Sequence, residues 1–256
     1  MHSALRIETG DMGEIKLGLC GFTIGAAQYY RRFKVLEVQQ TFYDPPAPET
    51  LRRWRDAAPP DFEFTMKAWQ VITHLGTSRT YRRLRSPFSD TQRGEAGGFR
   101  LNPTTIDAYQ RSLDACAILR ATAILFQCPP SFRPTAENAA AMREFFNTVE
   151  RPAGVRFLWE PRGKWPDDLI VELCHDCDLI HAVDPFVRPS LSPELIYWRL
   201  HGNGSHYAVY EDEELEQLIA WLPKSSDAYV MFNNIPRVGD SARFRELASD
   251  RGISLS

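Results

Sequence analysis

The feature that most constrains the fold is an alternation of short apolar runs with longer amphipathic segments along nearly the whole chain. Eight runs have the length and the β-branched or aromatic content of buried strands, and the segments between them have helical periodicity. The strands are predicted at 15–20, 35–41, 62–67, 121–127, 155–159, 179–183, 196–200 and 228–232. The helices are predicted at 26–33, 48–58, 104–119, 135–149, 166–175, 212–222 and 240–251.

This alternation predicts an α/β fold with a parallel sheet, because parallel neighbours need a long crossover that is usually helical. Eight such units in 256 residues favour a single closed (β/α)8 TIM-type barrel, with an open doubly wound sheet as the alternative. The connection 184–194 is short and rich in proline, so the crossover after the sixth strand is expected to be degenerate. A long loop, 67–104, is expected after the third strand.

The composition is that of one globular domain, with 43% hydrophobic residues and no shift that marks a second unit. We expect the barrel to cover residues 15–252 and residues 1–14 to be a disordered N-terminus. The five cysteines are odd in number and scattered through apolar stretches, which indicates a reducing, cytoplasmic location rather than a disulfide framework. No run approaches the ~18 apolar residues of a membrane span, so no membrane partner is expected.

Polar residues stand where the predicted strands end. The segment 197–204, YWRLHGNG, begins as a buried strand but carries Arg199 and His201 on one face before a glycine-rich turn. The polar residues at the strand ends are Glu37, Thr41, Tyr43, Lys67, Gln127, Glu160, Arg162, Asp184, Arg199, His201, Gly202, Asn233 and Asn234. In a (β/α)8 barrel these ends form one rim, where enzymes of this fold keep their active sites. Local hydrogen bonding at a solvated rim is the competing explanation for each residue alone.

The charges of this rim balance, which favours a polar organic ligand. The carboxylates are Glu37, Glu160 and Asp184, and the cations are Lys67, Arg162 and Arg199. Carboxylates can act as general acids or bases, while cations orient an anionic group or stabilise developing charge. We therefore predict acid–base or hydrolytic chemistry on a small polar or anionic molecule. The predicted catalytic group is Glu160 with Lys67 or His201, supported by Asp184 and Glu37, and the other rim residues are predicted to bind substrate.

No cofactor is predicted, although carboxylates with His201 could hold a divalent metal ion. The three cations compete for those carboxylates and repel such an ion. A metal site is therefore the less favoured alternative to a site for an organic ligand. A weaker signal is a phosphate site formed by the backbone of 202–205 and a final helix capped at Asp240 and Ser241. Ordinary turn chemistry is the favoured explanation of those glycines.

The net charge of −3 provides no global field for nucleic acid, so any polyanion must bind a local patch. The one basic patch that we find is the stretch from Arg79 to Arg100, with six arginines against two acidic residues and three glycines. It is either a solvated loop, a mobile lid or a nucleic-acid contact. A nucleic-acid-binding or phosphodiester-processing barrel is thus one alternative to the enzyme, and a non-catalytic ligand-binding protein is another.

Several motifs resemble the YecE-like family of unknown function, DUF72. They are LEVQQTFYDPP (36–46), FEFTMKAWQVITH (62–74), LFQCPPSF (125–132), Glu160-Pro161-Arg162, YWRLHGNG (197–204) and YVMFNN (229–234). The resemblance covers residues 15–250 in the family's order and implies a TIM-type barrel, but it implies no activity. Its recurrent positions fall on the rim residues named above. One departure is Cys20-Gly-Phe-Thr23, where many members carry a Gly-Ser-Gly-Trp-like sequence.

Overall fold

The computed structural model describes residues 13–256 and forms the predicted closed barrel. All eight strands are parallel, each pairs with the next, and β8 pairs with β1. They are β1 Ile15–Cys20, β2 Val35–Val38, β3 Glu63–Lys67, β4 Ala123–Gln127, β5 Arg156–Glu160, β6 Ile180–Val183, β7 Leu195–Leu200 and β8 Asp227–Phe232. Closure excludes the open doubly wound sheet. The predicted disordered terminus falls on residues 1–14, of which 1–12 lie outside the described residues.

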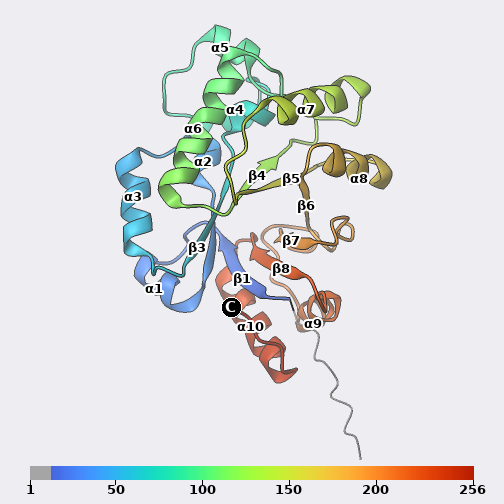
Figure 1. Ribbon diagram of the computed structural model, residues 1–256. Coiled ribbons are helices and arrows are strands. Elements are labelled where there is room, and N and C mark those ends of the chain that lie inside the picture. Colours follow the sequence, from blue (N-terminus) through green and yellow to red (C-terminus); the bar gives the residue numbers. More distant parts are fainter. Residues whose placement is uncertain (1–12) are drawn as a thin grey trace, which may run out of the picture.

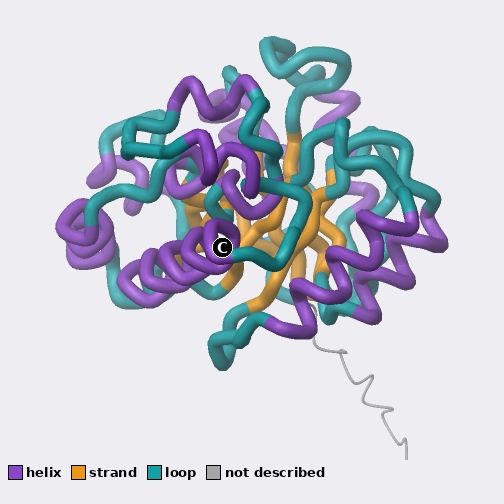
Figure 2. Tube along the Cα trace, turned by 90° about the horizontal axis from the view of Figure 1, so that it is seen from above, coloured by secondary structure: helices purple, strands orange, loops and turns teal. Residues whose placement is uncertain are grey.

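Helices surround the strands on the outside of the barrel (Figures 1 and 2). The main ones are α1 Ala26–Arg32, α3 Pro48–Ala57, α6 Pro103–Leu119, α7 Ala136–Thr148, α8 Asp167–Asp176, α9 Asp212–Trp221 and α10 Arg237–Asp250. Local chemistry sets their starts: in α6 the side chain of Asn102 accepts a hydrogen bond from Thr105 N at 3.0 Å, and Pro103 follows it. No helix among residues 13–256 is both long and apolar enough to span a membrane.

Two irregular connections also match the prediction. No helix forms between β6 and β7, so that crossover is degenerate. The long connection after β3 is partly folded into three short pieces, α4 Gln70–Thr73, the 3₁₀ helix η1 Arg79–Arg83 and α5 Asp90–Glu95. Five of the six arginines of the stretch from Arg79 to Arg100 lie in or beside η1 and α5.

Most predicted bounds agree with the structure to within two residues, but two of them are wrong by three residues. The strand predicted at 35–41 ends at Val38, and the chain turns at Gln39 into the short helix α2, Gln40–Tyr43. The cause is tertiary: the Thr41 hydroxyl donates to the carbonyl of Lys67 at 2.7 Å, which draws this segment over the end of β3. A β-branched residue therefore sits in a helix against its usual preference.

The final helix begins at Arg237 rather than at Asp240, so Asp240 and Ser241 do not cap it. Both residues are buried inside α10. The carboxylate of Asp240 accepts hydrogen bonds from the backbone N–H of Tyr210 and the side chain of Asn234. Asp240 therefore links the β7–α9 loop to the β8–α10 loop. The helix N-terminus at Asp240 and Ser241 that the predicted phosphate site required is not present.

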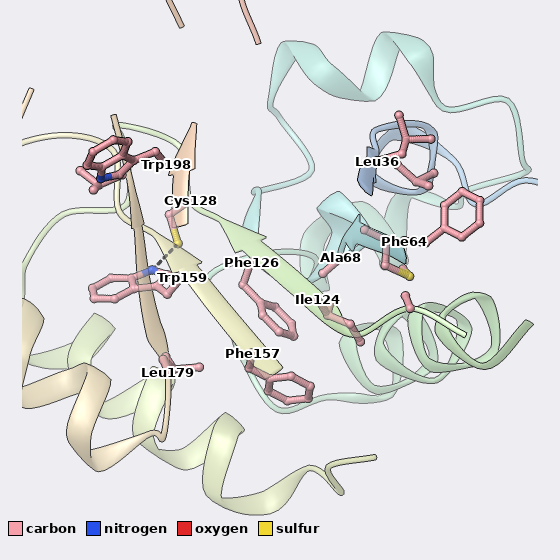
Figure 3. Close-up of a cluster of buried hydrophobic side chains, with 14 of the residues drawn as sticks. Leu36, Phe64, Ala68, Ile124, Phe126, Cys128, Phe157, Trp159, Leu179 and Trp198 are labelled. Atoms are coloured by element: carbon pink, nitrogen blue, oxygen red, sulfur yellow. Dashed lines mark hydrogen bonds between the residues drawn. The ribbon is translucent and has the colours of Figure 1, made fainter. Parts of the chain in front are cut away.

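The hydrophobic core has two layers because successive side chains of a strand face opposite sides. Phe126 of β4 and Phe157 and Trp159 of β5 face the helices, as Figure 3 shows. The rings of Phe126 and Phe157 meet edge to face, and Trp159 packs edge to face on Trp165. The indole N–H of Trp159 points at the sulfur of Cys128, 3.3 Å away. The inner layer fills the barrel with side chains such as Leu125, Leu158 and Met231. At the carboxyl ends of the strands this inner packing changes from apolar to polar.

Candidate active site

The last inward-facing positions of five strands carry polar side chains, and these form the floor of the site. They are Glu37, Lys67, Gln127, Glu160 and Arg199, and all are buried. On β7 the inward series is Leu195, Tyr197 and Arg199, so the same parity that fills the barrel lower down also places the arginine at its top. The convergence that the strand ends predict is therefore present.

Arg199 is the centre of the floor and is fully buried. Its Nη2 and Nε donate to the two carboxylate oxygens of Glu37 at 2.8 and 3.0 Å, a bidentate pair. Its Nη1 donates to Glu160 Oε2 at 2.5 Å. One guanidinium thus joins β7 to β2 and β5 across the barrel, which fixes both carboxylates before any ligand arrives.

The surroundings of Glu37 keep its carboxylate ionised. Burial acts to raise its pKa, but the attraction of Arg199 outweighs it, so the pKa lies below its ordinary value. The Tyr197 hydroxyl donates to Glu37 Oε2 at 3.0 Å, and the Gln39 amide donates to the other oxygen. Because every direction around this carboxylate has a donor, Glu37 organises the floor and has no free lone pair for a substrate proton.

Glu160 is held in a similar way. Burial acts to raise its pKa, but Arg199, Arg162, His201 and Lys67 together lower the pKa to about 2. Arg162, two residues beyond Glu160, approaches the carboxylate from the pocket side at 3.3 Å and is about one third exposed. Glu160 is therefore a carboxylate at neutral pH, and it positions the two arginines.

His201 lies between Arg162 and Asp184. Arg162 Nη2 donates to His201 Nε2 at 2.8 Å, so that ring nitrogen is unprotonated in this arrangement, since a guanidinium cannot accept. The other nitrogen, Nδ1, faces Asp184 Oδ2 at 3.4 Å. Asp184 also accepts a hydrogen bond from the backbone N–H of His201 at 2.9 Å. Asp184 thereby orients the imidazole toward Arg162.

Lys67 differs from every other charged residue of the floor. Its Nζ donates to the amide oxygen of Gln127 at 2.8 Å and lies 3.9 Å from the centre of the Phe42 ring. Within residues 13–256 no carboxylate oxygen lies within 4.0 Å of it. Burial, followed by the repulsion of Arg199, lowers its pKa to about 7, against the weaker attraction of Glu160 and Glu37. This lowered pKa favours the neutral amine of Lys67 far more than the ordinary value of a lysine does.

A pocket of about 730 Å³ opens above this floor, and we call it the Lys67 pocket. Most of the predicted site residues line it, namely Tyr43, Lys67, Gln127, Glu160, Arg162, Asp184, His201, Gly202 and Asn233. Among the lining residues that the sequence analysis did not assign to the rim are Gln39, Phe42, Thr80, Arg188 and His206. Phe42 directly follows the strand predicted at 35–41, and nothing in the sequence indicates that its segment forms the short helix α2 beside Lys67.

Four predicted residues contribute without facing the pocket. Glu37 and Arg199 lie beneath it, and Thr41 supports the end of β3. Asn234 is fully buried and donates to the carbonyl of Ala208 at 3.0 Å. Gly202 does line the pocket; its φ of 89°, and the collision that an added Cβ would make with the Ser205 carbonyl, make it a turn position.

The described residues hold no group of three or more His, Cys, Asp or Glu side chains placed to bind a metal ion. The reason is visible in the pairing: arginines occupy the oxygens of Glu37 and Glu160. The donor set thus does not fit a divalent cation as it stands.

A second cavity, of about 860 Å³, adjoins the first through Tyr43, which lines both. It is bordered by Trp54 and by Arg82, Arg83 and Arg85, and we call it the arginine groove. The guanidinium of Arg83 stacks 3.8 Å from the centre of the Tyr43 ring. Among residues 13–256 no carboxylate oxygen lies within 4.0 Å of the guanidinium nitrogens of these three arginines. Asp44, which also lines the groove, accepts instead from the backbone N–H groups of Arg85 and Ser86 at 3.1 Å.

Comparisons with known proteins agree with this fold. A model of the family described as "Protein of unknown function DUF72" matches residues 26–252. A DUF72 family protein from Enterococcus faecalis V583 has a TM-score of 0.68 at 18% identity, over 94% of this chain and 97% of that one. One from Thermotoga maritima MSB8 has a TM-score of 0.65 at 16% identity, over 92% and 99% of the two chains.

A more distant solved structure, endonuclease IV from Thermus thermophilus, has a TM-score of 0.53 at 11% identity, over 92% of this chain and 99% of that one. At these identities each likeness shows the barrel alone. The comparison with curated proteins gives no match.

Proposed function

This chain belongs to the DUF72 family, whose description assigns no function. From the geometry of the rim we propose that it is an enzyme in which Lys67 transfers protons to and from a small anionic substrate. The observation that carries the proposal is a buried amine with a pKa of about 7 at the floor of a pocket. A general base works best when its pKa lies near the working pH. Perturbed groups of this kind concentrate at functional sites.

The other rim residues have supporting roles in this proposal. Arg162 faces the pocket from beside Glu160 and would bind the anionic group of the substrate. Glu37 and Glu160 hold Arg199 and Arg162 and stay ionised, so they position cations instead of moving protons. His201, which lies between Arg162 and Asp184, would hold the guanidinium of Arg162 in place at the pocket.

The rate of such an enzyme should depend on pH through Lys67. With a panel of small carboxylates and phosphomonoesters as substrates, kcat/KM should rise about tenfold per pH unit below about 7 and level off above it, because only the neutral amine accepts a proton. Product formation by mass spectrometry across pH 5 to 9 measures this profile. A rate that is constant over that range would contradict the role of Lys67 as the base.

The arginine groove favours a second function, the binding of single-stranded nucleic acid beside the Lys67 pocket. Cationic side chains without a carboxylate partner, interleaved with Tyr43 and Trp54, are the elements of a single-strand site. We expect a labelled oligonucleotide to bind more weakly as salt rises. The triple variant Arg82→Ala, Arg83→Ala, Arg85→Ala should lower the slope of log K against log salt by about 2, at about 0.7 per phosphate contact.

Arg111 and Arg251 lie outside the groove and pair with Asp107 and Glu216. The variant Arg111→Ala, Arg251→Ala is therefore the matched control and should leave the slope unchanged. The absence of binding at low salt, or an equal loss in both variants, would exclude this second function.

A further inference from the structure

We propose that Lys67 forms a covalent imine with an aldehyde or ketone that carries an anionic group, an inference that rests on the proposed function and names its substrate class. The surroundings of the amine carry it. A buried ammonium group is normally paired with a carboxylate, whereas an exposed one can be solvated by water alone. In this chain the partly buried Lys16 has Glu63 at 2.6 Å. Lys67 has an amide oxygen and an aromatic ring in those places.

The carboxylates of the floor form hydrogen bonds with residues other than Lys67. Glu37 and Glu160 both lie on the same layer, but their oxygens accept from Arg199, Arg162, Gln39 and Tyr197. Arg199 at the centre of that layer repels an ammonium group. A lysine that is desolvated and placed near another cation is the arrangement that activates an amine as a nucleophile. The neutral amine so produced lies in a pocket with room for a small molecule.

The reaction balances without any further reagent. The lone pair of Nζ forms a bond to the carbonyl carbon, and the π electrons of the C=O bond move to oxygen. Both protons of the amine pass to that oxygen, the C–O bond breaks, and water leaves as the C=N bond forms. Arg162, which faces the same pocket, binds the carboxylate or phosphate of the carbonyl compound and holds the carbonyl carbon near the amine.

The test is reductive trapping at pH 7. Glyoxylate, pyruvate and glyceraldehyde 3-phosphate are each added with cyanoborohydride, which reduces an imine to a stable secondary amine, and the modified lysines are identified by mass spectrometry. The chain has five lysines, so the other four are internal standards. For at least one probe we expect Lys67, although buried, to be modified at least tenfold more than the exposed residues Lys164 and Lys224.

Two controls separate a specific imine from general amine reactivity. Lactate, which matches pyruvate but lacks the carbonyl, should compete with pyruvate and give no adduct, and Lys67→Arg should remove the adduct while Lys224→Arg keeps it. Modification of Lys67 no greater than that of the exposed lysines, with all three probes, would overturn the inference. Turnover with the predicted pH profile but without an adduct would overturn the imine alone and leave the proton-transfer function standing. An adduct on a protein that turns over no substrate would overturn the proposed function instead.

Discussion

Replacing Arg199 with methionine is expected to lower the free energy of unfolding by about 3–5 kcal/mol, the cost of removing one partner from a buried ion pair. Arg199 and Glu37 are both fully buried, and Arg199 is the only guanidinium that contacts Glu37 within residues 13–256. The variant leaves the carboxylates of Glu37 and Glu160 at the floor without their shared cation. Urea denaturation at pH 7 measures the loss. Arg52→Met, which removes an exposed pair with Glu49, should cost about 0.5 kcal/mol or less.

The pH dependence of this loss identifies its cause. In the wild type the pKa of Glu160 is lowered to about 2, so its stabilisation is present above the unfolded pKa of about 4.3 and is lost as the pH falls toward 2. Without Arg199, burial should raise the pKa of Glu37, so protonation of Glu37 removes the unpaired buried charge from the variant. The difference in the free energy of unfolding between the wild type and Arg199→Met should therefore shrink as the pH falls. The double variant Glu37→Gln, Arg199→Met should recover part of the loss; equal stability of Arg199→Met and Arg52→Met would contradict the account.

Replacing Lys67 with methionine is expected to lower kcat/KM by about 10²- to 10⁴-fold, the usual contribution of a positioned acid or base. The thioether has a similar length and can pack on Phe42, so the barrel should stay folded. Lys67→Arg separates two roles of this side chain: it keeps a positive charge but cannot supply a neutral amine. It should therefore be as inactive as Lys67→Met. Lys224→Met, at an exposed lysine outside the pocket, should keep full activity.

Full activity of Lys67→Arg would mean that the residue only supplies charge. Activity of Lys67→Met above a tenth of the wild type would contradict its assignment as the proton-transfer group.

The barrel could be predicted from the sequence because it follows from periodicity. Strands such as Ala123–Gln127 are apolar on both faces, as both sides of a parallel sheet are covered. The convergence of the strand ends then follows from topology. Thr41 shows the limit: its strand ends at Val38 because of a hydrogen bond to Lys67, which is 26 residues away along the chain. Asp240 similarly serves a contact with Tyr210 rather than a helix cap.

The pairing within the site could not be predicted for a related reason. The sequence shows three carboxylates and three cations at the rim, but it does not say which of them meet. Arg199 binds two of the carboxylates, those of Glu37 and Glu160, which lie 162 and 39 residues away along the chain. This pairing leaves Lys67 with Gln127 as its partner and leaves Glu160 ionised between two arginines, so Lys67 and not Glu160 is the group suited to proton transfer. The consequence appears only when the distances across the barrel are known.

The measurement that tests this account most directly is the stability of the wild type and of Lys67→Met by urea denaturation from pH 6 to pH 9. A folded pKa of about 7 against an unfolded value of about 10.4 means that the unfolded chain binds more protons between these values, so wild-type stability rises with pH above 7. Lys67→Met lacks this rise. We predict that the variant is the more stable protein at pH 6 and that its advantage shrinks by about 1.4 kcal/mol per pH unit above 7. A difference that stays constant from pH 6 to pH 9 would mean that Lys67 keeps its proton throughout, and it would contradict the account.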